Sequence, residues 1–342
     1  MPTEMHKYTD HYAQKRVYAR AVESDRYNLN DERRHRLATI PRVWTPQLGE
    51  GDQEEWDIVG PDDEPFRSQS LQVHFVTVPP GGRNVGHGHQ NEAFFYILEG
   101  HGFELHDGER YEWDEGYAVA VHNDCVHWHN NADPDHRAIA IVFKAKPTWL
   151  FMGLWQQGLL PTKPDDDDRW GPQIPWSLAR APEDEALPKV VKPTDTPWQL
   201  TPHGRLRLLA DETVPLRIKL TDSYLQEIPG GSRSGKRWQM ADEIFYVIEG
   251  RGYDLHWDVD VEITDRYYAR IAKEPTRWEW KAGDAVWIPQ NSVFQHFNSD
   301  PSNPLKLIAG SSRLYKMLGY RHPEELENAP EYDAEHAGAA AR

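Results

Sequence analysis

Histidines concentrated in two short segments carry the clearest chemical signal in this sequence. His87 and His89 are two residues apart in VGHGHQNEAFFYILEG, and VHNDCVHWHNN follows with His127 and His129. Residues two apart on a strand project from the same face, and neutral imidazole is the most common metal ligand among side chains. Two histidines from one strand and a third from a later strand can occupy one face of a metal octahedron, leaving positions for substrate and dioxygen. The spacing therefore predicts a metal site made by His87, His89 and a third histidine of the later segment, which offers His122, His127 and His129.

Other residues near these histidines have two interpretations each. An HxH pair alone is weak evidence, because two solvated histidines at a strand end have the same spacing. His129 shares a strand face with His127 and is either a proton-transfer residue beside the metal or a structural histidine. His74 in LQVHFVTV alternates with apolar residues and either faces the pocket or belongs to the core. His122 is expected to be structural or at the rim, and Cys125 to be a small buried residue.

A sequence repeat indicates which elements position the histidines. EAFFYILEGHGFEL (92–105) resembles DEIFYVIEGRGYDL (242–255), and YEWDEGYAVAVHNDCVHWHNN (111–131) resembles WEWKAGDAVWIPQNSVFQHFN (278–298). The offsets of 150 and 167 residues fit a 17-residue insertion in the second copy. Each copy consists of short alternating or apolar runs separated by glycine-containing turns, which is typical of antiparallel strands. Because no helical periods intervene, we predict an all-β protein with two tandem barrels.

Composition and charge exclude several classes of function. The 342-residue chain has 55 acidic and 38 basic side chains and a formal net charge of −17, which disfavours nucleic acid and anionic membrane surfaces as partners. The single cysteine rules out an internal disulfide, and the longest apolar runs have the length of strands. The N-terminal segment is polar and lacks the pattern of a signal peptide. We therefore expect a cytoplasmic protein that acts on a small molecule.

The histidine segments resemble the two motifs of the cupin superfamily. GGRNVGHGHQNEAFFYILEG and GYAVAVHNDCVHWHNN are similar to these motifs, and GDAVWIPQNSVFQH in the second copy resembles the second motif even more closely. The resemblance covers about residues 70–315 and implies a bicupin, with two tandem double-stranded β-helix (jelly-roll) barrels and short helical extensions. It places His87, His89 and His127 on the three histidine positions of the metal site.

One position of the motif differs in a way that narrows the resemblance. Ala93 stands where such families carry glutamate, and Glu92 projects from the opposite face of a strand. A three-histidine motif with alanine here is similar to the gentisate 1,2-dioxygenase group, which includes enzymes acting on salicylate and hydroxynaphthoate. That resemblance implies Fe(II) and oxidative ring cleavage of a hydroxylated aromatic substrate, with His129 as the candidate proton-transfer residue. The residues alone leave Mn, Ni and Cu open, and also whether Glu92 or His129 replaces a ligand.

The expected substrate-binding residues differ from those of that group. Such enzymes use an arginine on the strand after HxH to hold the substrate carboxylate by a bidentate contact, and this position is Phe95 here. Arg83 and Arg67 are the arginines nearby in sequence, and Arg83 is the candidate to take that role. Trp113 and His74 complete the candidate pocket together with Phe95. The identity of the substrate does not follow from these residues.

The second copy lacks the histidine set. GKRWQMADEIFYVIEG replaces the HxH segment, and two alternative registers place Lys236 and Trp238, or Arg237 and Gln239, at the histidine positions. Phe294 stands at the position of the third histidine. Only Glu243 and His296 remain as candidate ligands and would bind metal poorly, so we predict that the second copy is structural.

The repeat also predicts the domain organisation. The expected parts are an N-terminal extension (1–66), a first cupin with the metal site (67–146), a Pro- and Trp-rich connection (147–205), a second cupin (206–318) and a C-terminal helix with a tail (319–342). An amphipathic helix is expected at 12–23, and the chain is expected to form homo-oligomers. The alternatives to a dioxygenase are a redox-neutral metal-dependent cupin, such as an isomerase or decarboxylase, and a non-enzymatic ligand-binding cupin.

Overall fold

Strands dominate the chain, as the sequence predicts. The computed structural model describes residues 37–39, 45–46, 52–60, 66–68, 70–154, 157–159, 186–263, 267–320 and 323–337. Within these ranges the helices are α2 (Lys146–Phe151), α4 (Leu314–Met317) and α5 (Pro330–Ala337), and α5 is the predicted C-terminal helix. None of these helices has the length and apolar character needed to cross a bilayer. The helix expected at 12–23 lies outside the described residues.

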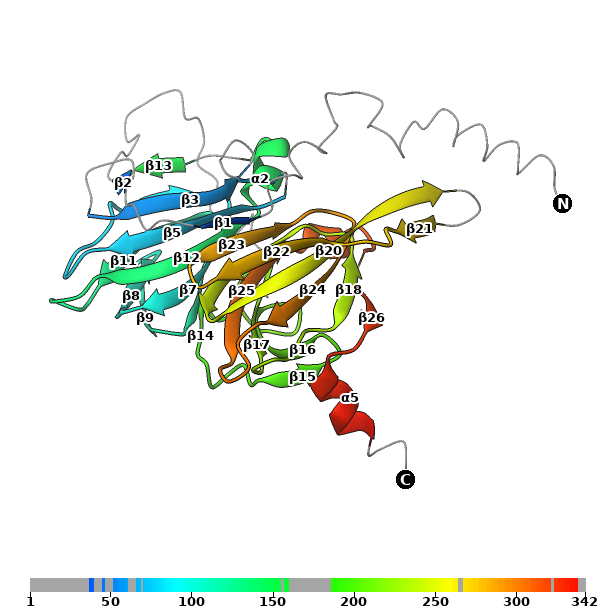
Figure 1. Cartoon of the computed structure of the whole chain (residues 1–342). Coiled ribbons are helices and arrows are strands. Elements are labelled where there is room, and N and C mark those ends of the chain that lie inside the picture. The colour runs from blue at the N-terminus through cyan, green and yellow to red at the C-terminus, as the bar shows by residue number, and fades with distance from the viewer. Residues whose placement is uncertain are drawn as a thin grey trace, which may run out of the picture.

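The first barrel is formed by two sheets (Figure 1). Its interface sheet, so named because it contacts the second barrel, has the order β14-β10-β7-β12-β5-β3-β2, with β4 on β3. The bounds are β2 (Thr45–Pro46), β3 (Glu54–Gly60), β4 (Phe66–Arg67), β5 (Gln72–Val78), β7 (Ala93–Glu99), β10 (Ala118–Val121), β12 (Ala138–Lys144) and β14 (Val190–Val191). Its site sheet, with the order β13-β6-β11-β8-β9, consists of β6 (His87–His89), β8 (His101–His106), β9 (Glu109–Asp114), β11 (Cys125–Asn131) and β13 (Gln157–Leu159).

The second barrel repeats this arrangement. Its interface sheet has the order β1-β23-β19-β25-β17-β16-β15, and the other sheet has the order β21-β20-β24-β18-β26 with β22 on β20. The bounds are β1 (Leu37–Thr39), β15 (Gln199–Thr201), β16 (Gly204–Ala210), β17 (Thr221–Ile228), β18 (Lys236–Gln239), β19 (Glu243–Glu249), β20 (Arg251–Ile263), β21 (Tyr267–Ile271), β22 (Thr276–Lys281), β23 (Asp284–Ile288), β24 (Ser292–Asn298), β25 (Leu305–Ser312) and β26 (Glu324–Glu327). The 17-residue insertion lengthens β20 and adds β21, which pairs with it from Val259 to Ile263.

The repeated unit extends beyond the motifs found in the sequence. β13 pairs with β6, and β26 pairs with β18, so the strand at the histidine positions gains an outer neighbour in each barrel. A short helix precedes each of these outer strands, and Gly153 and Gly319 follow the two helices with positive φ angles of 70° and 100°. Positive φ favours glycine and is a common helix ending. β13 lies in the segment predicted as the connection and β26 in the segment predicted as the tail, and the domain limits themselves stay a prediction.

The segment that precedes the first motif contributes a strand to each barrel. β3 pairs with β5 from Glu54 opposite Thr77 to Val59 opposite Val73. β1 pairs instead with β23 in the second barrel. Both strands fall in the predicted N-terminal extension, so this extension contributes strands to both barrels.

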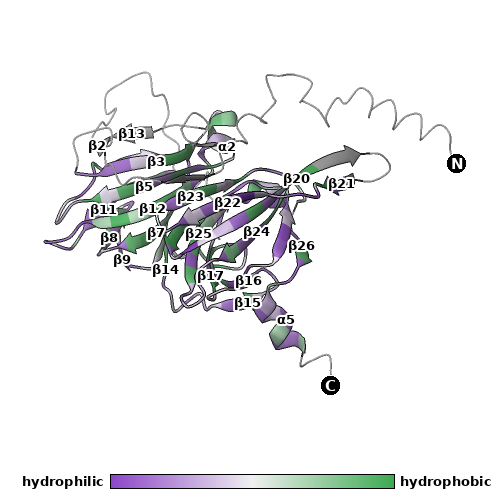
Figure 2. Ribbon diagram, in the orientation of Figure 1, coloured by the Kyte–Doolittle hydropathy of each residue, from purple (hydrophilic) through white to green (hydrophobic). Residues whose placement is uncertain are grey.

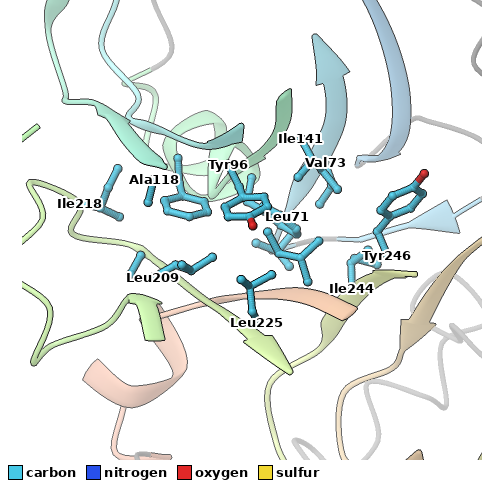
Figure 3. Packing of buried hydrophobic residues seen from close by; sticks show 14 of the residues in the cluster. Leu71, Val73, Tyr96, Ala118, Ile141, Leu209, Ile218, Leu225, Ile244 and Tyr246 are labelled. Atoms are coloured by element: carbon cyan, nitrogen blue, oxygen red, sulfur yellow. The ribbon is translucent and has the colours of Figure 1, made fainter. Parts of the chain in front are cut away.

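Side-chain alternation divides each interface strand between two hydrophobic cores. On β7, Ala93, Phe95 and Ile97 face the interior of the first barrel, whereas Phe94 and Tyr96 face the second barrel. Hydrophobic stretches of β7 and β12 accordingly lie in the body of the molecule (Figure 2). Figure 3 shows the shared core, in which the following residues of the two barrels meet: Leu71, Val73, Ala118 and Ile141 with Leu209, Ile218, Leu225 and Ile244. Burial of this apolar surface on both sides favours the packed pair of barrels.

Two buried carboxylates connect the barrels reciprocally. Glu92 accepts hydrogen bonds from two consecutive backbone N–H groups, those of residues 219–220, at 2.7 and 2.5 Å. Asp242, which occupies the same position in the second barrel, accepts hydrogen bonds from the hydroxyl groups of Ser68, at 2.6 Å, and Ser70. Glu92 therefore holds the segment that leads into β17 of the second barrel, and Asp242 holds the segment that leads into β5 of the first.

Replacing Glu92 by Gln is expected to lower the free energy of unfolding by about 1–3 kcal/mol, because the amide nitrogen leaves one of the two partly buried N–H groups without an acceptor. Urea unfolding followed by tryptophan fluorescence measures the change. Glu115→Gln, which alters an exposed carboxyl of the same barrel, is the control and should shift the free energy by less than about 0.5 kcal/mol. Coincident unfolding curves for the two variants would contradict the role assigned to Glu92.

Candidate metal centre

Two adjacent strands of the site sheet bring the three predicted ligands together. β6 and β11 pair antiparallel, with His87 opposite His127 and His89 opposite Cys125. The ring centroid of His127 lies 4.3 Å from that of His87 and 4.8 Å from that of His89, and the latter two are 5.4 Å apart. One nitrogen of each ring lies within 4.8 Å of those of the other two. The three side chains therefore surround one point, and they are called the triad below.

The hydrogen bonds of the triad select the tautomer that a metal requires. Nδ1 of each ring contacts the backbone carbonyl of a residue two positions away, at 3.1 Å for His87, 2.6 Å for His89 and 3.2 Å for His127. A carbonyl only accepts hydrogen bonds, so Nδ1 carries the proton and Nε2 keeps its lone pair. Metal-ligating histidines usually show this arrangement. The donor set thus fits a metal ion.

Burial keeps the triad neutral. The exposed fractions of His87, His89 and His127 are 7%, 6% and 1%. Burial lowers the pKa of His87 to about 4, and it holds the pKa values of His89 and His127 well below their usual value. Because metal binding requires the unprotonated nitrogen, no proton competes for these rings at neutral pH.

Within the described part of the chain, no carboxylate joins the triad. Ala93 faces the barrel interior, whereas Glu92 faces the second barrel and is held there by backbone N–H groups. In the second barrel the position of Ala93 is taken by Glu243, which is buried and accepts a hydrogen bond of 2.9 Å from the Tyr224 hydroxyl. The triad is therefore a set of three uncharged nitrogen donors.

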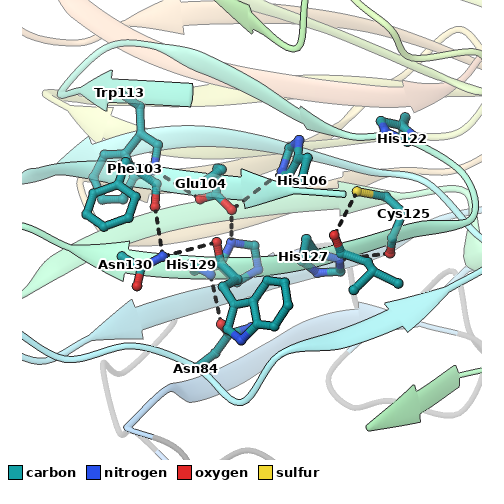
Figure 4. Close-up of polar contacts among 12 residues, drawn as sticks. Asn84, Phe103, Glu104, His106, Trp113, His122, Cys125, His127, His129 and Asn130 are labelled. Carbon is teal, nitrogen blue, oxygen red and sulfur yellow. Dashed lines mark hydrogen bonds and ion pairs between the residues drawn. The ribbon is translucent and has the colours of Figure 1, made fainter. Parts of the chain in front are cut away.

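A further buried histidine is held by a carboxylate that the sequence analysis missed. His129 and Glu104 are opposite each other on β11 and β8, with His129 Nδ1 2.5 Å from Glu104 Oε2 (Figure 4). Trp113 Nε1 donates to Glu104 Oε1 at 3.0 Å, and His106 Nε2 lies 3.6 Å from Oε2. Burial alone would raise the pKa of Glu104, but the neighbouring His129 and His106 lower it to about 2. The ionised carboxylate orients His129 and leaves its Nε2 as a hydrogen-bond acceptor.

The second barrel contains the same network. Asp254 Oδ1 lies 2.8 Å from His296 Nδ1 and accepts a hydrogen bond of 2.9 Å from Trp280 Nε1. His256 Nε2 lies 3.1 Å from Asp254 Oδ2. Burial would raise the pKa of Asp254 as well, and the two neighbouring histidines lower it to about 2.

The repeat contains the sequence signal for these two networks. HGFELH (101–106) and RGYDLH (251–256) keep an acidic residue, a histidine and a glycine in register. The glycine matters because a Cβ atom on Gly102 would lie 2.6 Å from the Trp113 ring. Because the network is found in both barrels, it belongs to the shared scaffold. Only in the first barrel does the network histidine, His129, lie beside a triad: its ring centroid is 5.0 Å from that of His127.

Two of the predicted pocket residues line a cavity next to His129. The cavity is small and is lined by Val76, Val78, Phe95, Ile97, Glu104, Trp113, His129, Ala138, Ile139 and Ala140. The Phe95 ring centroid lies 4.8 Å from that of His129. The walls are mainly apolar, with His129 and Glu104 as the polar groups, which is typical of a small-molecule site.

The other predicted pocket residues lie apart from this cavity. His74 is 2% exposed and continues the interior-facing series of Val76 and Val78, and neither of its ring nitrogens has a hydrogen-bond partner. The side chain of Arg83 is exposed, and its backbone forms a bridge with Asn130. Arg83 is thus on the surface rather than in the barrel interior. The side chain of Arg67 lies outside the described part of the chain.

A lysine on β12 is a further charged group near the triad. Lys144 continues the series of Ala138, Ala140 and Val142, whose side chains face the barrel interior. Burial lowers the pKa of Lys144 to about 8, and its ammonium group helps to lower the pKa values of His87 and His89. The sequence analysis missed Lys144, because a lysine that ends an apolar strand ordinarily extends into solvent.

Comparison with known proteins supports the cupin resemblance. Residues 74–143 match the family model described as Cupin domain, which covers the triad and His129. No curated protein matches the chain.

Solved structures share the two-barrel architecture at low sequence identity. The oxalate decarboxylase of Lactobacillus farciminis, in a formate complex, is 15% identical with a TM-score of 0.59, over 81% of this chain and 86% of that chain. The chain has the bicupin fold. An oxalate decarboxylase of Bacillus subtilis is 16% identical (TM-score 0.57, 81% and 77% covered), and salicylate 1,2-dioxygenase of Pseudoaminobacter salicylatoxidans is 15% identical (TM-score 0.55, 76% and 75% covered).

The second barrel of this bicupin has a salt bridge where the first has the triad. Arg237 is opposite Phe294 as His87 is opposite His127, which selects one of the two registers left open by the sequence. The Arg237 guanidinium contacts Glu325 of β26 at 2.6 and 2.7 Å. Among the described residues of this barrel, no group of ligand atoms is close enough together to hold a metal.

Two matched substitutions test the metal centre. His89 and Gln239 occupy equivalent positions, and each donates a hydrogen bond to the backbone carbonyl two residues later, at 2.6 and 3.2 Å. We expect the His89→Ala protein to retain one metal ion fewer per chain than the unmodified protein, because this substitution removes a metal ligand. Gln239→Ala should leave the metal content unchanged. Elemental analysis by mass spectrometry measures both, and equal content in all three proteins would exclude the triad as a metal site.

Proposed function

We propose that this bicupin is an Fe(II)-dependent dioxygenase that cleaves the ring of a hydroxylated aromatic compound. The observation that carries the proposal is a triad of neutral imidazoles beside Ala93. No carboxylate of the described residues joins this triad. The motifs resemble those of the gentisate 1,2-dioxygenase group, and the fold likeness to salicylate 1,2-dioxygenase supports the same class of reaction.

A neutral triad suits an anionic substrate. Three uncharged ligands leave the full charge of a divalent ion uncompensated, so a phenolate is attracted to the site. When bound, Fe(II) supplies coordination positions for substrate and dioxygen and serves as template and electron conduit. The protein keeps water away from the site, since the triad is almost fully buried and Phe95 and Trp113 give the neighbouring cavity apolar walls.

His129 is positioned to take the proton of the substrate hydroxyl group. Its Nδ1 is held by Glu104, so the proton would be accepted at Nε2. The ionised Glu104 carboxylate then stabilises the imidazolium that forms, as a positioned partner does for other histidine bases. The His129 ring lies between the triad and the cavity, because it contacts the ring of His127 in the triad and that of Phe95 in the cavity wall.

Lys144 is positioned to bind an anionic group of the substrate. Enzymes of the gentisate 1,2-dioxygenase group hold the substrate carboxylate with an arginine at the position of Phe95, and a phenylalanine cannot make this contact. Arg83 is exposed and cannot replace that arginine. With a pKa of about 8, Lys144 carries a positive charge at neutral pH and lies near His87 and His89. A lysine is a point charge rather than a planar fork, so it would hold a carboxylate with less geometric selectivity than arginine.

An oxygen electrode tests the reaction class directly. With Fe(II) and gentisate, salicylate or hydroxynaphthoate, we expect dioxygen uptake that matches the substrate consumed. Lys144→Met is expected to raise KM for such carboxylated substrates by about tenfold or more, the equivalent of losing an ion pair worth about 1.4 kcal/mol. Lys192→Met, which alters an exposed lysine of the same barrel, should leave KM unchanged. Substrate loss without dioxygen uptake would contradict the proposal.

The duplicated network provides a control for His129. His129→Gln is expected to lower kcat by about 10²–10⁴-fold, the usual contribution of a general base, while the metal is retained. His296→Gln removes the equivalent imidazole in the second barrel and should cost similar stability without lowering kcat. Thermal unfolding and steady-state kinetics on both variants separate the two roles. If both variants lose kcat equally, His129 acts only through the scaffold.

A redox-neutral metal-dependent reaction, such as decarboxylation or isomerisation of a small acid, is the second candidate. Its support is the fold likeness to oxalate decarboxylase, which covers 81% of this chain. Carbon dioxide release or isomer formation without dioxygen uptake would identify it. Stoichiometric metal without any turnover would instead favour a ligand-binding cupin. The cytoplasmic location and the homo-oligomeric state stay predictions.

A further inference from the structure

Three residues with metal-binding side chains meet at the rim of the first barrel, outside the triad. Asp107 lies in the turn between β8 and β9, His122 follows β10, and Cys125 begins β11. One ligand atom of each lies within 4.8 Å of those of the other two. His122 and Cys125 are buried, whereas the Asp107 side chain is 39% exposed, so the group is open to solvent on one side. Figure 4 shows His122 and Cys125 on the side of His127 that is away from His129.

Two hydrogen-bond acceptors face each other in this rim group. His122 Nδ1 lies 2.9 Å from the backbone carbonyl of Asn123, so Nδ1 carries the ring proton. Nε2 then presents its lone pair to Asp107 Oδ2 at 3.5 Å. Burial lowers the pKa of His122 to about 4, so a second proton is not available at neutral pH. Asp107 Oδ1 also accepts a hydrogen bond of 3.1 Å from the Val126 backbone N–H, and the positive charge of Arg217 helps to lower the pKa of His122. The Nε2 lone pair and the carboxylate are both oriented to bind a cation.

The shared scaffold does not require these residues. At the offsets of 150 and 167 residues, the second barrel has Trp257, Pro289 and Ser292 in their places. That barrel forms the same carboxylate network with no acid, imidazole or thiol at these three positions. The rim group is therefore a feature of the metal-binding barrel alone.

A neighbouring histidine has unmet hydrogen-bonding capacity. His106 is 2% exposed; its Nε2 lies 3.6 Å from Glu104 Oε2, and its Nδ1 has no hydrogen-bond partner among the described residues. Its ring centroid lies 6.0 Å from that of His122 and 6.2 Å from that of His127. A buried polar atom without a partner costs about 1–3 kcal/mol. A hydrated ion held by the rim group offers His106 the missing partner.

We propose that Asp107, His122 and Cys125 form a second cation site, of the kind that binds zinc. One thiolate, one imidazole and one carboxylate are ligands that Zn²⁺ combines, with a fourth position for water. The thiolate and the carboxylate neutralise the ion, so the site adds no net charge beside the neutral triad. Binding forms the sulfur–metal bond as the thiol proton is released to solvent, one proton for each ion bound.

Cobalt and zinc titration of a protein without the triad tests the second site. In a His87→Ala background, one Co²⁺ per chain should bind with a thiolate-to-metal charge-transfer band in the near ultraviolet, and Zn²⁺ should displace it. Cys125→Ser and Asp107→Asn should each abolish this band. Asp114→Asn, which changes an exposed acid of the same barrel, should preserve it. A His87→Ala protein that binds no Co²⁺, or binds it without the charge-transfer band, would overturn the proposal.

The unmodified protein gives a second readout that does not depend on the His87→Ala fold. With zinc in excess, it should hold two ions per chain, and Cys125→Ser should hold one. One ion in both proteins would also overturn the proposal. Neither measurement involves turnover, so the rim site and the proposed dioxygenase activity succeed or fail separately.

Discussion

The alternation of side chains along β7 is the constraint on which the metal centre depends. Glu92, Phe94 and Tyr96 face the second barrel, and Ala93, Phe95 and Ile97 face the interior. A shift of one residue would exchange these two sets and place a carboxylate beside the triad. The packed core between the barrels and the hydrogen bonds to Glu92 prevent that shift. The neutral character of the metal centre is thus set by the contact between barrels as much as by the histidines themselves.

The two barrels show how one scaffold accommodates different interiors. Both retain an acid, a tryptophan and two histidines in the same arrangement, centred on Glu104 in one barrel and Asp254 in the other. The first places three neutral rings beside this network, and the second places the ion pair of Arg237 and Glu325 there. A guanidinium is always charged, so the second interior is complete without a metal. The first brings three neutral ring nitrogens together, an arrangement that fits a metal ion.

The interior of the first barrel contains negatively charged, neutral and positively charged groups in turn. The carboxylate of Glu104 is ionised behind His129, the triad is neutral, and Lys144 adds a positive charge towards the end of β12. An anionic substrate would therefore meet positive charge at the metal and at Lys144, and a proton acceptor at His129. Apolar walls surround this path, which strengthens each electrostatic contact because water cannot screen it. The proposed roles in binding, orientation and proton transfer thus fall on residues that come from four different strands.

The sequence by itself determined the tandem barrels, the approach of His87, His89 and His127, and the outward position of Glu92. These features follow from local periodicity, from the repeat and, for the choice of His127, from the resemblance to the cupin motifs, none of which needs knowledge of long-range contacts. Only the tertiary structure decided the register at Arg237, the exposure of Arg83, the pairing of His129 with Glu104, the position of Lys144 and the rim group of Asp107, His122 and Cys125. Each of these depends on which residues of separate strands become neighbours. That choice is made by strand pairing and by the packing of one barrel on the other, and spacing along the chain does not contain it.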